Sequence, residues 1–231
     1  MIIVARSEDK LNQLKAELEK EYKVEVKVIA KDLTKFESTQ EIYDEVKAEG
    51  IQVEYLLNNA GFGGHGYFHE RTMEEDMAMI NLNIIALTSL TKLFLPDFTK
   101  RNSGKILNVS STASFMPGPL QAVYFATKAF VTFLSNAISE ELSNTNITVT
   151  NLMPGATETE FAKAAGMDKS NLFENTFSAL SVANDGYEGM LKGKMDVVSG
   201  LTFSQKLMIS GIPFTPKKML LKQVHKMQKI Q

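Results

Sequence analysis

The chain has 231 residues, 44% of them hydrophobic and 23% charged, which is ordinary for a soluble globular protein and excludes a disordered or collagen-like chain. Its 25 basic and 27 acidic residues give a net charge of −2, which creates no overall field to attract nucleic acid or an anionic membrane. It has no cysteine and hence no disulfide or thiolate nucleophile, and no apolar run approaches the roughly 18 residues of a membrane span. We therefore expect a cytoplasmic protein that binds no nucleic acid and does not insert stably into a membrane.

Strand and helix patterns alternate along the first half of the chain. Ser7 and two capping boxes, which begin at Thr34 and Thr72, mark three helix starts. They predict helices over Glu8–Tyr22, from Thr34 to about Gly50, and from Thr72 to Pro96 or beyond. Apolar and alternating segments predict strands over residues 1–5, 24–28 and 53–57.

The same alternation continues in the second half. We predict strands over 105–109, 147–152 and 196–199, and helices over 121–142 and 177–191. A basic amphipathic helix is expected within 214–231. It could lie on a membrane surface, but we favour a helix that packs over the substrate cleft or against a subunit partner. Such alternation predicts an α/β fold, a doubly wound parallel sheet with helices on both faces, in a single domain over 1–231.

Residues 61–66 match the pattern G-x-G-x-x-G and follow a predicted strand. A dinucleotide fingerprint needs its last glycine to open a helix, whereas residues 67–71 separate this one from the cap at Thr72. We interpret the segment as a flexible loop at the ligand-facing edge of the sheet. His65 and His69 share this loop without a helix to fix them, so no metal site is expected.

Tyr124 and Lys128 lie four residues apart in a predicted helix and so share one face. A nearby ammonium favours the phenolate, which lowers the pKa of a phenol and lets the pair exchange a proton with a substrate oxygen. A solvated Tyr–Lys contact is the ordinary alternative. Ser110 and Ser111 end the preceding strand, where either hydroxyl could meet a substrate carbonyl or merely satisfy strand-end backbone groups.

Several ordered motifs, spread from Met1 to about Ser199, together resemble the short-chain dehydrogenase/reductase family, a cofactor-binding Rossmann type. The spacing of thirteen between Ser111 and Tyr124 is the family's usual one and favours Ser111 over Ser110. The other matching motifs are Asn58-Asn59-Ala60-Gly61, Asn83 within Asn81-Leu82-Asn83-Ile84, Tyr124-Phe125-Ala126-Thr127-Lys128 and Pro154-Gly155-Ala156-Thr157-Glu158-Thr159.

The resemblance implies a role for each matching residue. Tyr124 would be the general acid/base, Lys128 would lower its pKa and hold the nicotinamide ribose, and Ser111 would polarise the carbonyl. Asn83 would hold a water that links Lys128 to solvent, unless it is a backbone-capping amide. Residues implied to line the cofactor are Asp32, Leu33, Asn58, Ala60, Gly61, Tyr124, Lys128, Pro154, Gly155, Thr157 and Thr159.

The cofactor preference follows from the end of the segment that matches the family's second strand. NAD-binding folds usually place an acid there, whereas this chain has Arg6 and Ser7. Arg6 offers a charged donor fork to a 2′-phosphate and Ser7 a further donor, so we predict NADP. A solvated arginine at a helix start is the alternative. The expected reaction is reduction of a small-molecule carbonyl, or oxidation of an alcohol, by a homodimer or homotetramer.

One part of the family pattern has no match in this sequence. The family begins with a strand, a Gly-rich turn and a helix before the segment that matches Met1, so we expect a truncated Rossmann-type domain. In the family that strand lies between the strands that match residues 1–5 and 53–57. Three outcomes are possible: the strands at 1–5 and 53–57 could pair directly, the chain could fold poorly and bind cofactor weakly, or the natural protein could be longer. We favour the third outcome. A non-catalytic or cofactor-weakened scaffold is the alternative function. The resemblance implies that residues 160–192 cover the substrate. Within them an apolar ligand is suggested by Phe161, Leu172, Phe173, Phe177 and Leu180, although core packing explains these residues equally well.

Overall fold

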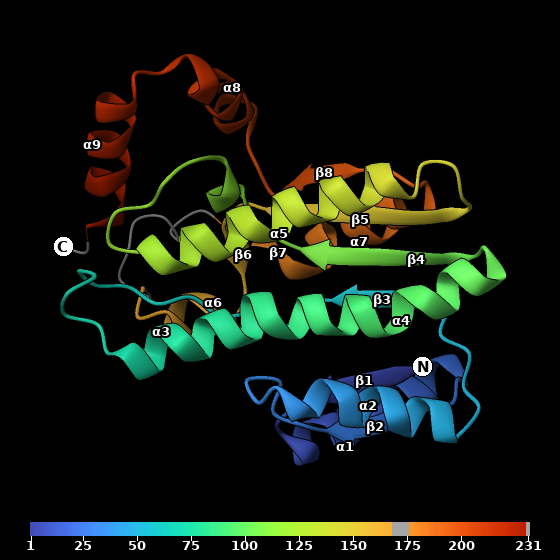
Figure 1. The fold of residues 1–231 in the computed structure, drawn as a ribbon. Helices are drawn as coiled ribbons and strands as arrows, with labels where there is room; N and C mark the ends of the chain where they lie inside the picture. Colours follow the sequence, from blue (N-terminus) through green and yellow to red (C-terminus); the bar gives the residue numbers. More distant parts are fainter. Residues whose placement is uncertain (168–175, 230–231) are drawn as a thin grey trace.

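The computed structural model describes residues 1–167 and 176–229 and has an α/β architecture (Figure 1). Its largest sheet has the order β3-β4-β5-β8, and all of its strands are parallel. A separate parallel pair joins β1 to β2, and a short one joins β6 to β7. The strands are β1 (Ile2–Ala5), β2 (Lys27–Ala30), β3 (Tyr55–Asn58), β4 (Gly104–Val109), β5 (Ile147–Pro154), β6 (Thr157–Glu158), β7 (Phe177–Ser178) and β8 (Asp196–Ser199).

Helices cover both faces of the four-stranded sheet, as predicted. One core places Ile106 and Val149 of the sheet against Phe94 and Phe98 of a long helix, and the other places Leu107 and its neighbours against α7. The helices are α1 (Glu8–Tyr22), α2 (Glu37–Ala48), α3 (Met73–Ile80), α4 (Leu87–Arg101), α5 (Ala122–Glu141), α6 (Phe161–Ala164), α7 (Ala179–Leu191), α8 (Phe203–Gly211) and α9 (Lys217–Gln228), with a π-helical turn η1 (Asn81–Ala86) and 3-10 turns η2 (Thr112–Phe115) and η4 (Ile212–Phe214).

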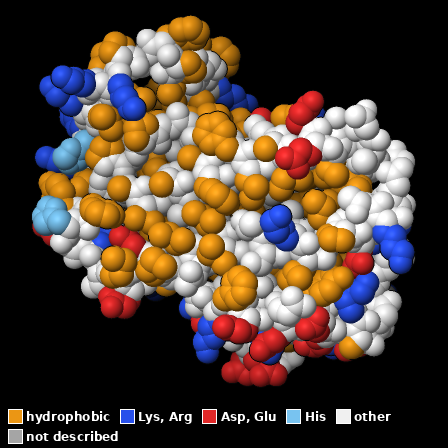
Figure 2. All heavy atoms as spheres, viewed as in Figure 1, with side chains coloured by type: hydrophobic (Ala, Val, Ile, Leu, Met, Phe, Trp, Pro, Cys, Tyr) orange, Lys and Arg blue, Asp and Glu red, His pale blue; other side chains and the backbone are white. Residues whose placement is uncertain are grey.

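The run from α3 through η1 to α4 is a single long helix, Met73–Arg101. By length and composition alone it could cross a membrane, the one helix in residues 1–167 and 176–229 that could. Phe94 and Phe98 of this helix are almost fully buried in the core, which is the position of a core helix in a globular fold. Apolar side chains gather on the outer face over α3, α4 and α5 (Figure 2).

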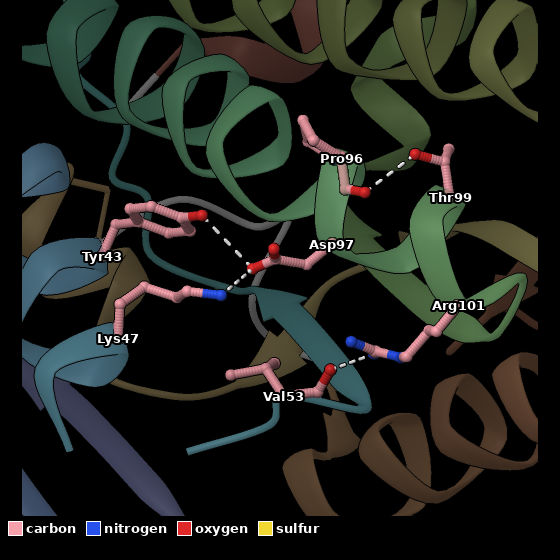
Figure 3. Close-up of polar contacts among 7 residues, drawn as sticks. All are labelled: Tyr43, Lys47, Val53, Pro96, Asp97, Thr99 and Arg101. Atoms are coloured by element: carbon pink, nitrogen blue, oxygen red, sulfur yellow. Dashed lines mark hydrogen bonds and ion pairs between the residues drawn. The ribbon is translucent and has the colours of Figure 1, made fainter. Parts of the chain in front are cut away.

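The β1–β2 pair is joined to the rest of the molecule through helices rather than through a shared ladder. On α4, Asp97 accepts hydrogen bonds from Tyr43 Oη (3.3 Å) and Lys47 Nζ (3.0 Å) of α2 (Figure 3). Nearby, Arg101 of α4 donates to the backbone oxygen of Val53, just before β3. Within the described residues β1 and β3 do not pair, so the direct pairing considered from the sequence does not occur.

A row of polar side chains crosses the four-stranded sheet. In the strand register Asn58 lies beside Asn108, Asn108 beside Asn151, and Asn151 beside Asp196. Asn58 Nδ2 donates to Asn108 Oδ1 (2.9 Å), and Asn151 Nδ2 donates to Asp196 Oδ1 (2.9 Å). The three asparagines are buried, so these bonds satisfy the Nδ2 groups of Asn58 and Asn151 and the Oδ1 of Asn108 where water cannot reach them.

Some predicted boundaries are wrong for identifiable reasons. The box at Thr34 does not cap a helix, because Thr34 donates through its backbone N–H (3.0 Å) and its hydroxyl (2.8 Å) to Asp32, and α2 begins only at Glu37. The second strand starts at Lys27 instead of 24. The box at Thr72 is confirmed, with both reciprocal bonds to Glu75. The helices α8 and η4 were not predicted, and Leu172 and Phe173 lie outside the described residues.

Candidate active site

A cavity of about 980 Å³ opens at the carboxyl ends of the parallel strands. It extends from Arg6, just after β1, past the ends of β4 and β5, to the C-terminal helices α8 and α9. Tyr124, Lys128 and Ser111 all line it. The sheet edge that binds ligands in open α/β folds therefore carries the predicted catalytic residues.

Tyr124 and Lys128 lie on the same side of α5, as their spacing predicted. Lys128 Nζ is 5.8 Å from the centre of the Tyr124 ring, and both side chains are buried. The ammonium donates to the backbone oxygen of Val109 at the end of β4 (2.9 Å). Phe161 packs against the Tyr124 ring with centroids 5.3 Å apart, which fixes its orientation within the cavity.

The acidity of this pair differs from the expectation. Burial raises the pKa of Tyr124 to about 12, although a hydrogen bond with Ser111 opposes part of this change. Burial also lowers the pKa of Lys128 to about 8. Desolvation disfavours each charged form, and here it outweighs the attraction that was expected to make the phenol more acidic. At neutral pH Tyr124 therefore keeps its proton and can act as an acid.

The two serines at the end of β4 have different surroundings. Ser110 is buried and donates to the backbone oxygen of Lys128 (2.7 Å), while its hydroxyl also shares a bond with Thr132 (2.8 Å). Ser111 Oγ accepts from the backbone of Ala113 (3.1 Å) and hydrogen-bonds Tyr124. Ser110 is thus occupied in joining β4 to α5, which favours Ser111 as the hydroxyl that meets a substrate.

Asn83 lies in the π-helical turn and is almost fully buried. Its Oδ1 accepts from the backbone N–H of Phe62 (3.1 Å), and its Nδ2 donates to the Phe62 oxygen (2.9 Å) and to Thr127 Oγ1 (3.0 Å). These bonds tie the loop after β3 to α5. They agree with the alternative of an amide that satisfies backbone groups, and the water-holding role stays a prediction.

The nicotinamide half of a cofactor fits the residues in the middle of the cavity. A Cβ on Gly61 would lie 3.1 Å from Asn83 Oδ1 and 3.3 Å from Lys128 Nζ, so any other residue here would crowd these two side chains. Gly155 and Thr157, which line the same region, are fixed by a bond from Gly155 N to Ser199 O (2.9 Å) and one from Thr157 Oγ1 to Gly155 O (3.0 Å). Pro154 and Thr159 line it as well.

The residues expected near the adenosine are less uniformly placed. Arg6 lines the cavity. The hydrogen bond from the backbone of Thr34 is the largest cause that lowers the pKa of Asp32, and the charge of Arg6 makes a smaller contribution in the same direction. Leu33 belongs to the apolar core, and Asn58 to the buried polar row. Neither of these residues lines the cavity, and the same is true of Ser7, Asp32 and Ala60. In the described chain no lining glycine belongs to a turn that opens a helix, so no pyrophosphate cradle is present there.

The C-terminal helix α9 covers one end of the cavity, as one of the two preferred interpretations of the sequence predicted, whereas the contribution of α8 and η4 was not predicted. The apolar wall at this end consists of Met208, Ile209, Ile212, Leu220, Val224 and Met227. Two lining glutamines there are 4% exposed and keep a side-chain atom without a hydrogen-bond partner, Nε2 in Gln121 and Oε1 in Gln228. Buried polar atoms are normally paired, and among the described residues that line the cavity these two are exceptions.

The loop 61–66 is packed, in contrast to the flexible loop that was expected. Gly63 and Gly64 are buried, and Gly64 lies so close to the guanidinium of Arg71 that a Cβ there would collide with it. His65 Nε2 hydrogen-bonds the backbone oxygen of Gln228 (2.8 Å), whereas the His69 side chain is 78% exposed beside Glu70. The loop therefore closes the cavity against α9.

The chain is similar in sequence and fold to known proteins. Residues 1–170 match the family model of the short chain dehydrogenases. The very-long-chain 3-oxoacyl-CoA reductase of Macaca fascicularis is 32% identical over 199 residues, which cover 84% of this chain and 62% of that protein. The chain thus spans about three fifths of the length of the curated relatives it matches.

Two solved structures have the same fold. The short-chain dehydrogenase from Sphingobium yanoikuyae in complex with NADPH is 30% identical, with a TM-score of 0.82, over 92% of this chain and 83% of that one. The alcohol dehydrogenase from the archaeon Thermococcus sibiricus, complexed with 5-hydroxy-NADP, is 26% identical, with a TM-score of 0.74, over 86% of this chain and 84% of that one.

Proposed function

The chain belongs to the short-chain dehydrogenase family, and we propose that it reduces a carbonyl group through Tyr124, Lys128 and Ser111. The observation that supports this most directly is the placement of these three side chains in one cavity, with a protonated phenol beside a hydroxyl donor. A nicotinamide cofactor, when bound, supplies the hydride that adds to the carbonyl carbon. The protein must then supply a proton to the carbonyl oxygen.

In this proposal Tyr124 gives its phenolic proton to that oxygen, which completes the alcohol. Because the raised pKa keeps Tyr124 protonated at neutral pH, the side chain is in the form that must donate the proton during reduction. The Ser111 hydroxyl donates a second hydrogen bond to the same oxygen and fixes its position. The ammonium of Lys128, held by the Val109 carbonyl, stabilises the negative charge that remains on the phenolate.

NADP is the proposed form of the cofactor. Arg6 is the basic residue that lines the cavity beyond the sheet edge, and guanidinium groups bind phosphate through two parallel hydrogen bonds. Two of the structural relatives were solved with NADPH or an NADP derivative. An Arg6→Ala variant should raise the KM for NADPH at least about tenfold and change the KM for NADH little. An equal loss for both cofactors would contradict the preference.

For the substrate we propose a 3-oxoacyl thioester with a long apolar chain. The relatives at about 32% identity are named as very-long-chain 3-oxoacyl-CoA reductases. Such a substrate carries a second carbonyl oxygen, to which Gln121 Nε2 can donate, because that atom has no hydrogen-bond partner among residues 1–167 and 176–229. Its chain would extend along the apolar wall that begins with Ile212 and Leu220.

The test is NADPH oxidation with 3-oxoacyl thioesters of increasing chain length and with simple ketones. Longer thioesters should have lower KM values, and Tyr124→Phe should reduce turnover by about 10² to 10⁴ while NADPH still binds. Gln121→Met should raise the KM for thioesters and leave simple ketones unchanged. The side chain of Gln121 makes no capping bond to α5, so this variant should still fold.

The gap between β1 and β3 supports a second candidate, a scaffold that keeps the fold but binds cofactor weakly. A fluorescence titration with NADPH separates the two candidates. Saturable binding favours the reductase, whereas no binding favours the scaffold. In either case we propose a homodimer or homotetramer, supported by the exposed Met73, Met77, Phe130 and Phe133 on α3 and α5, and light scattering would measure it.

A further inference from the structure

The C-terminal arm, formed by α8, η4 and α9, stands away from the sheet layers (Figure 1). No residue of α8 or η4 is buried, whereas α9 buries Leu220, Val224 and Gln228 against the rest of the molecule. Gln205, Met208 and Ile209 of α8 line the cavity. The arm is therefore a wall of the cavity on its inner side and is uncovered on its outer side.

The outer side carries large apolar groups. Phe214 is 88% exposed and Phe203 83%, the two most exposed large apolar side chains in the described part of the chain. Leu207, one turn after Phe203 on α8, is 65% exposed, and Met219 on α9 is 63% exposed. Soluble proteins leave single apolar residues on their surface, but a cluster of this kind on one arm marks an interaction site.

Charge identifies the class of partner. From residue 197 to the end, the chain contains six lysines and no aspartate, glutamate or arginine, although the whole chain has a net charge of −2. Lys218, Lys222 and Lys226 are exposed and, by helical spacing, lie on the side of α9 opposite its buried residues, near Met219. On α8, Lys206 likewise neighbours Phe203 and Leu207, and Figure 2 shows basic and apolar side chains interspersed on this lobe. No residue of the arm forms an ion pair with any other described residue.

We propose that the outer side of the arm docks on an anionic lipid bilayer, with Phe203, Leu207, Phe214 and Met219 entering the interface and the lysines binding lipid headgroups. An amphipathic helix with apolar groups beside lysines is the form that binds in the plane of such a surface. A bilayer is favoured over an acidic protein, because exposed large apolar side chains and exposed lysines lie together on the arm, which is the combination that binds in the plane of an anionic lipid surface. Docking would place the apolar wall of the cavity beside the lipid, and it does not depend on the proposed reaction.

Vesicle co-sedimentation tests the proposal with the full chain. One set of vesicles contains phosphatidylcholine alone, and the other contains phosphatidylcholine mixed with phosphatidylglycerol. The protein should bind the mixed vesicles at low salt, bind them much less at high salt, and bind the neutral vesicles weakly. Absence of binding to the mixed vesicles, or equal binding to both sets, would overturn the proposal.

Matched variants locate the surface. A Phe203→Ser/Phe214→Ser double variant should lower the partition coefficient at least about tenfold, and a Lys218→Gln/Lys222→Gln/Lys226→Gln variant similarly. The controls are Phe133→Ser on α5 and Lys10→Gln/Lys20→Gln on α1, which are exposed elsewhere and should bind as the parent does. Circular dichroism verifies that each variant is folded. If the phenylalanine pair leaves vesicle binding unchanged, or instead breaks a dimer seen by light scattering without lipid, the arm is not a membrane surface.

Discussion

The buried ammonium of Lys128 has a consequence for stability that a Lys128→Met substitution isolates. Burial lowers the pKa of this lysine from 10.5 to about 8, so the folded state loses the proton at a lower pH than the unfolded state does. Between these two values the unfolded state binds more protons, and the free energy of unfolding therefore rises with pH. At 1.36 kcal/mol per pKa unit, the full change is about 3 kcal/mol, of which about 2 kcal/mol should develop by about pH 9.5.

Urea unfolding of the parent and of Lys128→Met, at about pH 7 and about pH 9.5, measures this contribution. The parent should gain about 2 kcal/mol relative to the variant over that interval, because methionine has no proton to lose. The interval stops below pH 10, since the raised pKa of Tyr124 acts in the opposite direction from there upward. A Lys92→Met variant is the control, because Lys92 is exposed on α4. If the difference between parent and Lys128→Met is the same at both pH values, the ammonium is not desolvated as the structure indicates.

Three further predictions concern single contacts. Asp97→Ala, which removes the bonds from α2 to α4, should lower the free energy of unfolding by about 1–2 kcal/mol in urea; a loss no larger than that of an exposed control would contradict it. Ser110→Ala should cost about 1–2 kcal/mol of stability and keep its turnover. Ser111→Ala should lose about a hundredfold in kcat, with a stability loss of about 1 kcal/mol from the cap on Ala113; full turnover in Ser111→Ala with a lost turnover in Ser110→Ala would reassign the catalytic serine. Gly61→Ala should lower kcat and change thermal stability little, because its Cβ meets Asn83 Oδ1 at 3.1 Å; parent kinetics would show that the neighbours move aside.

Local sequence signals predicted most of the fold. Alternating apolar segments located the parallel strands, and the reciprocal bonds of Thr72 and Glu75 confirmed one capping box. The capping box predicted at Thr34 does not form, because the Asp32 carboxylate accepts the backbone N–H of Thr34 that the Glu37 side chain would accept in a capping box. The spacing of residue types does not reveal this competition. The helix α8 of the C-terminal arm was not predicted, because none of its residues is buried and its sequence therefore shows no strong apolar periodicity.

The candidate site was predictable where chemistry depends on spacing along one element. Tyr124 and Lys128 share a face because they are four residues apart on α5, and that prediction needed no tertiary information. Their acidity was predicted in the wrong direction, because the extent of burial depends on how Phe161 and the C-terminal helices cover them. The free amide of Gln121 was invisible for the same reason, since a missing partner is a property of the folded surroundings.

The polar row from Asn58 to Asp196 also helps to set the register of the strands in the sheet. A slip by one residue turns every side chain of a strand to the other face of the sheet, and buried polar side chains add to the cost of such a slip. In this sheet a slip by one position would separate the asparagine amides from their partners. Each buried polar group left without a hydrogen bond would lower the free energy of unfolding by about 1–3 kcal/mol. Misaligned sheets are thereby disfavoured as competitors during folding, before any ligand is present to select the correct one.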